Sequence, residues 1–335
     1  MSPFDLTDIL RNHRVYIQTH NFPDPDAISS AFGLQQFLDF HGIPATLCYD
    51  GKIDRLSSKK MLDTFGITMH SKDSLPHMTK DDFIVLVDSQ KLNSNVTDLI
   101  GDEVACIDHH PIFFEYDYLY QDIQKVGACA SIIASYYQQT DTPISPNCAA
   151  ALAYGIKMDT ADFNRGTTLL DTQMLSFLFS HADWGLVTHM YTNTMEFDDL
   201  QAYGAAIQNI QIFGGTGFAY IPFDCATALI AIISDFILSL DVVDIAIIYA
   251  MQTDGIRFSV RCEQNRVHAG NLISHVMKPW GSGGGHYSMA GGMIPSEHIH
   301  LLGEDIHISI QDSFLKGIAH MEKEAVSKED THKTV

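Results

Sequence analysis

Acidic and histidine residues recur at the ends of short apolar runs in the first half of this chain, and each run has the pattern of a strand or a buried helix. The carboxyl ends of neighbouring parallel strands meet at one edge of an α/β sheet, so this spacing predicts a single cluster. Buried like charges repel and resist losing their hydration, so such a cluster needs a cation. Oxygen-rich ligands with a few histidines suit Mn²⁺ or Mg²⁺ better than a thiolate-bound metal. The residues concerned are His20, Asp24, Asp26, Asp88, Asp108, His109, His110 and Asp159.

Each of these residues alone also has an ordinary structural explanation. An aspartate that opens a helix, as Asp26 is expected to do, usually caps the N-terminus. Asp88 and Asp159 stand where acidic residues often end a strand or a helix, and His109–His110 is compatible with a surface pair. Together these explanations require five acids and three histidines to gather at one sheet edge without a reason. A shared metal site is therefore the better interpretation.

The first half of the chain alternates between strand-like and helix-like segments, which predicts a doubly wound parallel α/β sheet. The run Phe83–Val87 is almost entirely apolar, as in a strand covered on both faces. The other expected strands are Arg14–His20, Ala45–Tyr49 and Glu103–Ile107. The expected helices are one from Pro25 or Asp26 to about Gly42, then Leu56–Phe65, Ala128–Tyr137, Cys148–Lys157 and Asp171–Ser180.

The pattern changes near Trp184, so two domains are expected: residues 1–185, a helical linker at 186–213, and a smaller α/β domain at 214–325. The second domain should contain a hairpin across the Thr253-Asp254-Gly255 turn. Its expected elements are the strands Phe218–Pro222, Asp244–Met251 and Ile256–Cys262 and the helices Ala226–Leu240, Asn271–Met277 and Ile308–Ala325.

A glycine run, GSGGGHYSMAGG, extends from Gly281 to Gly292 and contains His286. We expect a loop there, because glycine-rich loops expose backbone N–H groups that bind anions. The run has neither the P-loop spelling nor a convincing dinucleotide-binding fingerprint. In a chain this acidic, the basic residues shortly before it are informative, because arginine suits bidentate phosphate contacts. They are Arg257, Arg261, Arg266 and His268.

The formal net charge of −21 argues against binding to long nucleic acid, which depends on many Lys and Arg contacts to phosphate. It does not exclude a small phosphorylated ligand neutralised by metals. The six cysteines have irregular spacings and mostly lie in apolar runs, as buried free thiols do. The longest apolar stretch, Ala226–Leu240, contains Asp235 and is too short to cross a bilayer. These features favour a soluble protein of the cytoplasm that does not bind membranes.

The polar motifs resemble, in order, the four motifs of the DHH phosphoesterases. They are His20-x3-Asp24-x-Asp26, then Asp88, then Asp108-His109-His110, then Asp159. The later segments RFSVRC and GSGGGHYSMAGG resemble the DHH-associated C-terminal domain, with its Ser-x-Arg strand and its GGGH loop. The resemblance covers about Arg14 to Pro295.

This resemblance implies a two-metal, usually Mn²⁺-dependent enzyme with a cleft between its domains; Mg²⁺ is the alternative ion. His20, Asp24 and Asp88 would bind one ion, and Asp26, Asp88, His109 and Asp159 the other, with Asp88 as the bridge. The catalytic set would be Asp88, His110 facing the substrate phosphate, and Asp108 orienting His109 or His110. The substrate-binding set would be Ser259, Arg261, Gly283, Gly284, Gly285 and His286.

The implied reaction is hydrolysis of a phosphate ester in a short oligonucleotide, a dinucleotide or a nucleotide bisphosphate. The chain length is similar to that of the oligoribonuclease and 3′-phosphoadenosine-5′-phosphate phosphatase branch, whose members often pair as homodimers. Three alternatives differ from this reaction. An inorganic pyrophosphatase or polyphosphatase shares the N-terminal motifs but not the GGGH loop. A non-catalytic nucleotide sensor is disfavoured by the intact ligand set. A nicotinamide-dependent oxidoreductase lacks the fingerprint after the first strand.

Overall fold

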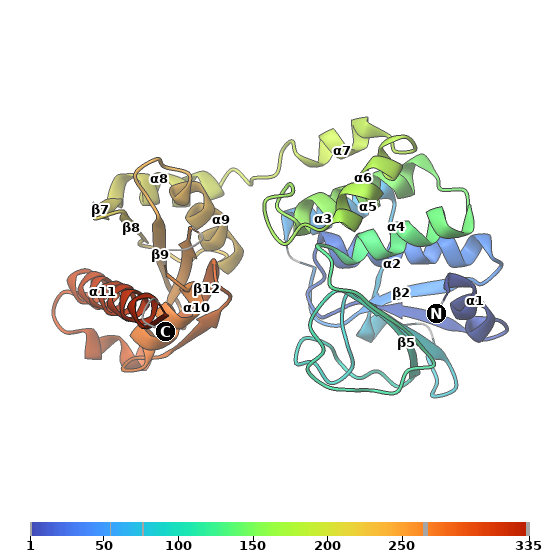
Figure 1. Cartoon of the computed structure of the whole chain (residues 1–335), viewed down its shortest axis with the longest axis horizontal. Helices are drawn as coiled ribbons and strands as arrows, with labels where there is room; N and C mark the ends of the chain where they lie inside the picture. The colour runs from blue at the N-terminus through green and yellow to red at the C-terminus, as the bar shows by residue number, and fades with distance from the viewer. Residues whose placement is uncertain (1, 54, 76, 264–266, 333–335) are drawn as a thin grey trace. The chain divides into compact units, whose positions relative to one another are not determined.

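The computed structural model describes residues 2–53, 55–75, 77–263 and 267–332, so Arg266 lies outside the described residues. The chain divides into two compact units, Met1–Thr194 and Met195–Val335 (Figure 1). The segment expected to link the domains, residues 186–213, is shared between these units. Its first part belongs to a helix that packs on the first unit, and its second part to a helix that packs on the second.

The first unit is built on a six-stranded parallel sheet, which confirms the expected α/β fold. The strand order is β3-β2-β1-β4-β5-β6, and every pairing is parallel. Two edge strands, β3 and β6, escaped prediction because they are short and polar. The strands are β1 (Val15–Gln18), β2 (Ala45–Tyr49), β3 (His70–Ser71), β4 (Phe83–Val87), β5 (Asp102–Asp108) and β6 (Tyr120–Ile123).

All seven α-helices of this unit share one hydrophobic core with the sheet. The opposite face carries Tyr16, Ile84 and Leu86, which pack against the connecting-segment residues Leu99 and Tyr118. Loops and one 3₁₀ turn (Lys72–Ser74) therefore cover the second face, where a doubly wound fold usually places helices. The helices are α1 (Pro3–Leu10), α2 (Pro25–Phe40), α3 (Leu56–Phe65), α4 (Cys129–Thr140), α5 (Pro146–Asp159), α6 (Leu169–Phe179) and α7 (Trp184–Met190).

The strand order fixes where this sheet can bind a ligand. The chain passes from β1 to β2 on one side, and β4 then pairs with the other side of β1. The loops that follow β1 and β4 consequently diverge, which makes the carboxyl ends of these two strands a topological switch point. Ligands of open α/β sheets bind at such points.

The second unit has a mixed six-stranded sheet of order β11-β12-β10-β9-β8-β7. Only the β8–β9 pairing is parallel. Helices α10 and α11 pack on one face, and α8 and α9 on the other. The elements are α8 (Asp199–Asn209), β7 (Gln211–Phe213), β8 (Thr216–Ile221), α9 (Thr227–Leu238), β9 (Ile245–Gln252), β10 (Gly255–Cys262), α10 (Ala269–Met277), β11 (Ser282–Gly285), β12 (Met289–Pro295), a 3₁₀ helix (Ser296–Leu302) and α11 (Ile306–His332).

The glycine run is not the loop expected from its composition. Residues Ser282–Gly285 form β11, which pairs antiparallel with β12. Gly285 has φ +155°, and a Cβ there would lie 2.5 Å from the carbonyl oxygen of Met289. Only glycine permits the close approach at this end of the hairpin, and His286 begins the turn that follows. Among the described residues, no helix is long and apolar enough to cross a membrane.

Candidate metal centre

Asp88 is the central residue of the site, and it follows directly on β4. Its backbone is left-handed (φ +56°), which is uncommon for a residue with a Cβ. Its side chain is only 3% exposed. Within the described chain, its Oδ1 atom accepts no hydrogen bond. A buried carboxylate oxygen without a partner is costly, so a cation at this point would stabilise the fold.

Two imidazoles face Asp88, and backbone carbonyls determine their orientation. The Nδ1 atom of His20 lies 2.8 Å from the carbonyl oxygen of Asn21. The Nδ1 atom of His109 lies 3.1 Å from the carbonyl oxygen of Val126. Because a carbonyl oxygen can only accept a hydrogen bond, we place a proton on Nδ1 of each ring. This arrangement leaves Nε2 free for a metal, as in most metal-binding histidines.

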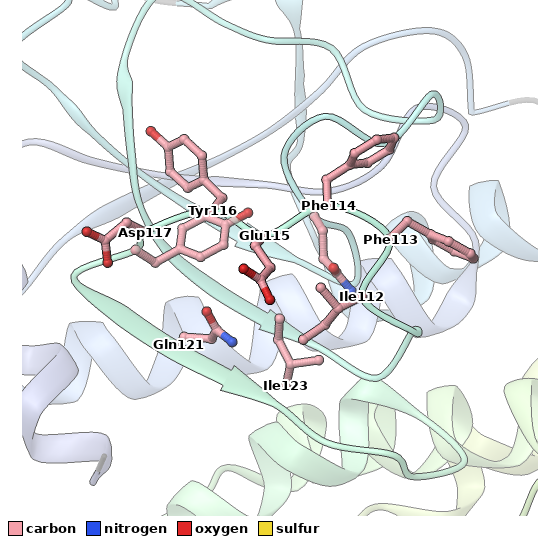
Figure 2. Close-up of a pocket in the computed structure, with 10 residues that line it drawn as sticks. Ile112, Phe113, Phe114, Glu115, Tyr116, Asp117, Gln121 and Ile123 are labelled. Atoms are coloured by element: carbon pink, nitrogen blue, oxygen red, sulfur yellow. The ribbon is translucent and has the colours of Figure 1, made fainter.

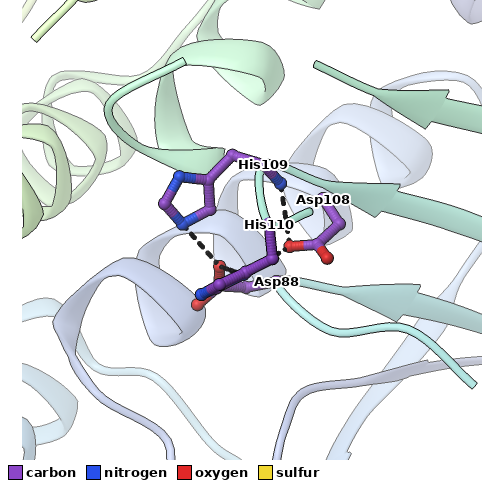
Figure 3. Close-up of side chains that lie close together, drawn as sticks. All are labelled: Asp88, Asp108, His109 and His110. Carbon is purple, nitrogen blue, oxygen red and sulfur yellow. Dashed lines mark hydrogen bonds and ion pairs between the residues drawn. The ribbon is translucent and has the colours of Figure 1, made fainter. Parts of the chain in front are cut away.

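Both Nε2 atoms point at carboxylates, and Figure 3 shows the contact between His109 and Asp88. In His20, Nε2 lies 3.5 Å from Oδ2 of Asp88. In His109, Nε2 lies 3.3 Å from Oδ1 of Asp88 and 3.4 Å from Oδ2 of Asp159. The lone pair of a neutral imidazole repels a carboxylate at such distances unless a proton or a metal ion lies between them. The donor geometry therefore fits a divalent cation.

Asp26 connects the site to helix α4. Its carboxylate is fully buried and accepts from the backbone N–H groups of Cys129 at 2.7 Å and Ala130 at 2.9 Å. The side chain of Ala128, at the N-cap of α4, cannot cap the helix, so Asp26 does so from a distant part of the chain. Its Oδ2 atom also lies 3.9 Å from Nε2 of His109.

Asp24 and Asp159 lie at helix ends on the two sides of this cluster. Asp24 is the N-cap of α2 and accepts from the backbone N–H of Ala27, while its Oδ1 atom lies 4.0 Å from Nε2 of His20. Asp159 is the last residue of α5, and the guanidinium of Arg165 contacts its Oδ1 atom at 3.5 Å. Both side chains keep about a quarter of their surface exposed, so a ligand can reach them.

Asp108 holds His110 in place. Its Oδ1 atom accepts from Nδ1 of His110 at 2.9 Å (Figure 3). Its Oδ2 atom accepts from the side-chain amide of Gln90 at 2.7 Å. The His110 side chain is 47% exposed, unlike the other imidazoles of the site. Asp108 therefore orients His110 rather than His109, which it contacts only through the backbone N–H. Gln90 was not among the site residues predicted from the sequence.

The structure thus brings together all eight candidate residues of the first unit. Within the described chain, three overlapping groups have ligand atoms that lie within 4.8 Å of one another, which suits divalent cations with oxygen and nitrogen ligands. They are His20, Asp24 and Asp88; Asp26, His109 and Asp159; and Asp88, Asp108, His109 and His110.

Without a metal, protons balance the charge of this cluster. Burial lowers the pKa of His20, but its contact with Asp88 outweighs burial and raises that pKa to about 9. Burial also lowers the pKa of His109, but contact with the Asp88 carboxylate again outweighs burial and raises that pKa to about 11. Burial, together with Asp88, raises the pKa of Asp159 to about 6 and that of Asp26 well above its usual range. The pKa of Asp88 itself is lowered, because its two histidine partners outweigh its burial.

A buried carboxylate outside the cluster, Asp171, stabilises the carbonyl that orients His109. The N–H of Gly127 donates to Asp171 at 2.9 Å, and the C=O of Val126, in the same peptide unit, accepts from His109. A negative charge on the N–H side polarises the peptide and strengthens its carbonyl as an acceptor. Asp171 also accepts from the Ser131 hydroxyl, the Thr168 N–H and the Thr168 hydroxyl.

In the second unit, Ser259 and Arg261 lie together on β10, where Nη1 of Arg261 donates to Oγ of Ser259 at 3.1 Å. Asp235 of α9 pairs with the same guanidinium at 2.5 Å. Gly284 and Gly291 occupy the same row of the sheet as Ser259. A Cβ at Gly284 would meet no atom within 4 Å, so this row presents open backbone beside Ser259.

Two family comparisons agree with this geometry. Residues 14–156 match the DHH family, N-terminal domain, and residues 215–308 match the DHHA1 domain. The chain belongs to the DHH family. The two matched segments contain most of the candidate residues of both units, in the order that the resemblance requires.

Two relatives and one solved structure resemble this chain. An uncharacterized protein of Methanocaldococcus jannaschii is 28% identical over 281 residues, which is 83% of this chain and 57% of that protein. A manganese-dependent inorganic pyrophosphatase of the same organism is 28% identical over 172 residues, 48% of this chain and 52% of that enzyme. The structure of an exopolyphosphatase-related protein from Bacteroides fragilis shares the fold, with a TM-score of 0.70 and 17% identity over 93% of this chain and 94% of that chain.

The raised histidine pKa values predict that Mn²⁺ affinity increases with pH. A metal ion must displace the protons of His20 and His109, which both rings hold at neutral pH. Each displaced proton raises the apparent affinity up to about tenfold per pH unit below those pKa values. Calorimetry between pH 6 and 8, in buffers of different ionisation enthalpy, should show proton release. A pH-independent affinity without proton release would contradict this assignment.

Replacing Asp171 should weaken metal binding although Asp171 is not a ligand. Asp171→Asn removes the charge that polarises the Val126–Gly127 peptide, whose carbonyl orients His109, and loss of such outer partners costs about tenfold or more in metal affinity. The matched control is Asp183→Asn, which removes the charge of the residue that caps the neighbouring helix α7. Mn²⁺ titration by electron paramagnetic resonance measures the affinity, and the nitrogen shifts of His109 report its tautomer. Equal effects of the two variants on both readouts would show that Asp171 is only structural.

Proposed function

We propose that this protein is a hydrolase that cleaves phosphate esters of short oligonucleotides, dinucleotides or nucleotide bisphosphates with the help of two divalent cations, Mn²⁺ in the first place. The observation that carries the proposal is the buried Asp88 carboxylate, which lies between the Nε2 atoms of His20 and His109. One of its oxygens faces each ring, so Asp88 would serve both the ligand group that contains His20 and the one that contains His109. A shared carboxylate suits a pair of ions. The name of the manganese-dependent relative supports the choice of metal.

In this proposal each ligand group holds one ion. His20, Asp24 and Asp88 form the first group, and Asp26, Asp88, His109 and Asp159 form the second. Bound Mn²⁺ would supply Lewis acidity toward the phosphate and would lower the pKa of water. In the reaction, a water oxygen bonds to phosphorus, the ester P–O bond breaks, and the leaving oxygen takes up a proton.

The chain's own catalytic contribution centres on His110. Its ring is half exposed, while its Nδ1 atom is held by the buried Asp108. The contact with Asp108 raises the pKa of His110, which favours the protonated ring. A protonated imidazole in this position would donate a hydrogen bond to a phosphoryl oxygen, where negative charge develops in the transition state.

The residues of the second unit are proposed to bind the rest of the substrate. Arg261 is only 13% exposed and is held by Ser259 and Asp235, so its guanidinium is preorganised. The open row at Gly284 and Gly291 would allow a ligand to approach the backbone closely. Gly283, Gly285 and His286 complete this proposed set.

Pyrophosphate hydrolysis is the second candidate, because the pyrophosphatase relative matches about half of this chain. One substrate panel with Mn²⁺ separates the two functions. It should contain short RNA, a linear dinucleotide, a cyclic dinucleotide, a nucleotide 3′,5′-bisphosphate and pyrophosphate. The proposal requires turnover of at least one nucleotide at a kcat/KM well above that of pyrophosphate. The homodimer expected from the resemblance remains a prediction that sedimentation can test.

Removal of the shared carboxylate should abolish turnover. Asp88→Asn keeps the size of the side chain but weakens its contact with both ions, so Mn²⁺ occupancy should fall together with activity. Asp98→Asn, a change at an exposed aspartate of the β4–β5 loop, is the matched control. Metal analysis and initial rates measure the effect. Full activity with two bound ions in Asp88→Asn would refute the bridging role.

Loss of Arg261 should affect substrate binding more than metal binding. A charge-assisted contact to phosphate is worth roughly 2–5 kcal/mol when one partner is removed, so KM should rise about 30-fold or more in Arg261→Ala. Arg257→Ala is the matched control, because that guanidinium lies four residues away on β10 and pairs with Asp254. Unchanged KM and kcat in Arg261→Ala would remove this residue from the substrate site.

A further inference from the structure

A pocket lies among the segments that follow β4 and β5 in the first unit (Figure 2). Its volume is about 720 Å³, within the usual range of small-molecule sites. Most of its wall comes from the β5–β6 connection, which begins at His109 and includes His110. Ile123 of β6, another lining residue, is the register partner of Asp108. The pocket therefore opens near the same sheet edge as the candidate metal centre.

Gln90 belongs to both sites. It lines the pocket, and its side-chain amide donates to the Asp108 carboxylate at 2.7 Å and to the carbonyl oxygen of His110 at 3.1 Å. Gln90 therefore connects the pocket directly to Asp108 and His110 of the candidate metal centre.

The lining is aromatic and carries no positive charge. Four aromatic rings contribute to it, and none of the described lining residues is Lys, Arg or His. Its charged members are carboxylates, Glu115 among them. This lining would repel a phosphate group. It suits an uncharged planar ring whose amino groups can donate to a carboxylate.

Two of the four rings are held by contacts within the protein, and the other two are exposed and could stack on a ligand. Tyr116 and Tyr118 pack against each other at 4.8 Å, and the Tyr118 hydroxyl accepts from the backbone N–H of Lys91. Phe113 and Phe114 are 72% and 54% exposed, and along the described chain neither ring has an aromatic neighbour. Exposed phenylalanines beside a preorganised wall are the arrangement on which nucleobases stack.

We propose that this pocket, bordered by Gln90, Phe113, Phe114, Glu115, Tyr116 and Tyr118, binds a nucleobase of the substrate whose phosphate lies at the metal centre. The inference rests on the proposed phosphoesterase function and names its substrate class. Pyrophosphate has no ring to place there, so the pocket selects nucleotides through their bases.

The first experiment measures binding without catalysis. Adenosine carries no phosphate, so its binding to protein treated with a metal chelator isolates the base pocket. Ligand-observed NMR should show saturation of the adenine protons. Phe113→Ala should weaken this binding about tenfold, the usual effect of losing one stacking partner. Phe40→Ala, a change at a 59% exposed phenylalanine that lies outside the pocket lining, should leave it unchanged.

The second experiment compares two substrates in the Mn²⁺-loaded protein: a diadenosine dinucleotide and the same dinucleotide with one base removed. Phe113→Ala should raise KM for the full dinucleotide about tenfold and change the abasic substrate little. The proposal is overturned if adenosine does not bind, or if both substrates respond equally. It is also overturned if Phe113→Ala instead dissociates a dimer and leaves adenosine binding intact. Adenosine binding without hydrolysis of any nucleotide would contradict only the proposed function.

Discussion

The interaction on which the first unit depends is the contact of one buried carboxylate, Asp88, with two imidazoles whose protons point away from it. Carbonyl oxygens fix the Nδ1 protons of His20 and His109, so both Nε2 lone pairs face negative oxygens. Such an arrangement is unstable without a cation. The left-handed backbone at Asp88 adds strain of about 1–3 kcal/mol, which persists only where the surrounding structure holds it. Strain and charge at one residue indicate a site selected for binding rather than for stability.

The fold supplies this geometry through its topology. Residues from four parts of the chain meet only because β1, β4 and β5 run parallel and side by side, with α2 beginning and α5 ending at the same edge. The helices occupy one face, and loops cover the other. Loops can form a pocket more readily than packed helices, because their side chains are not committed to a common core. The metal centre and the aromatic pocket therefore border the same edge of one sheet.

The sequence predicted that these acidic and histidine residues gather at one edge of the sheet, and the structure brings them together, because acidic residues after apolar runs have few alternatives in a parallel sheet. It could not predict residues that act through the backbone. Thr168-x-x-Asp171 has the pattern of a capping box, and the structure contains that box. The same carboxylate also accepts from the N–H of the Val126–Gly127 peptide, whose carbonyl orients His109. The glycine run predicted a loop where the structure has strand β11. Glycine has low strand propensity, and β11 depends on pairing with β12. Short-range patterns do not contain such long-range contacts.

The overall charge explains why two different kinds of contact are needed for substrate recognition. A chain with net charge −21 repels phosphates from most of its surface. Attraction must then be local: cations at the carboxylate cluster, and Arg261, whose charge Asp235 partly offsets. Neither contact distinguishes one phosphate compound from another. The aromatic pocket, whose described lining includes the carboxylates of Glu115 and Asp117 but no Lys, Arg or His, would add that distinction without adding positive charge, because stacking depends on the ring and not on the phosphate. Under the proposed function, the bound cations would determine which bond is cleaved, and the pocket would determine which molecules present that bond.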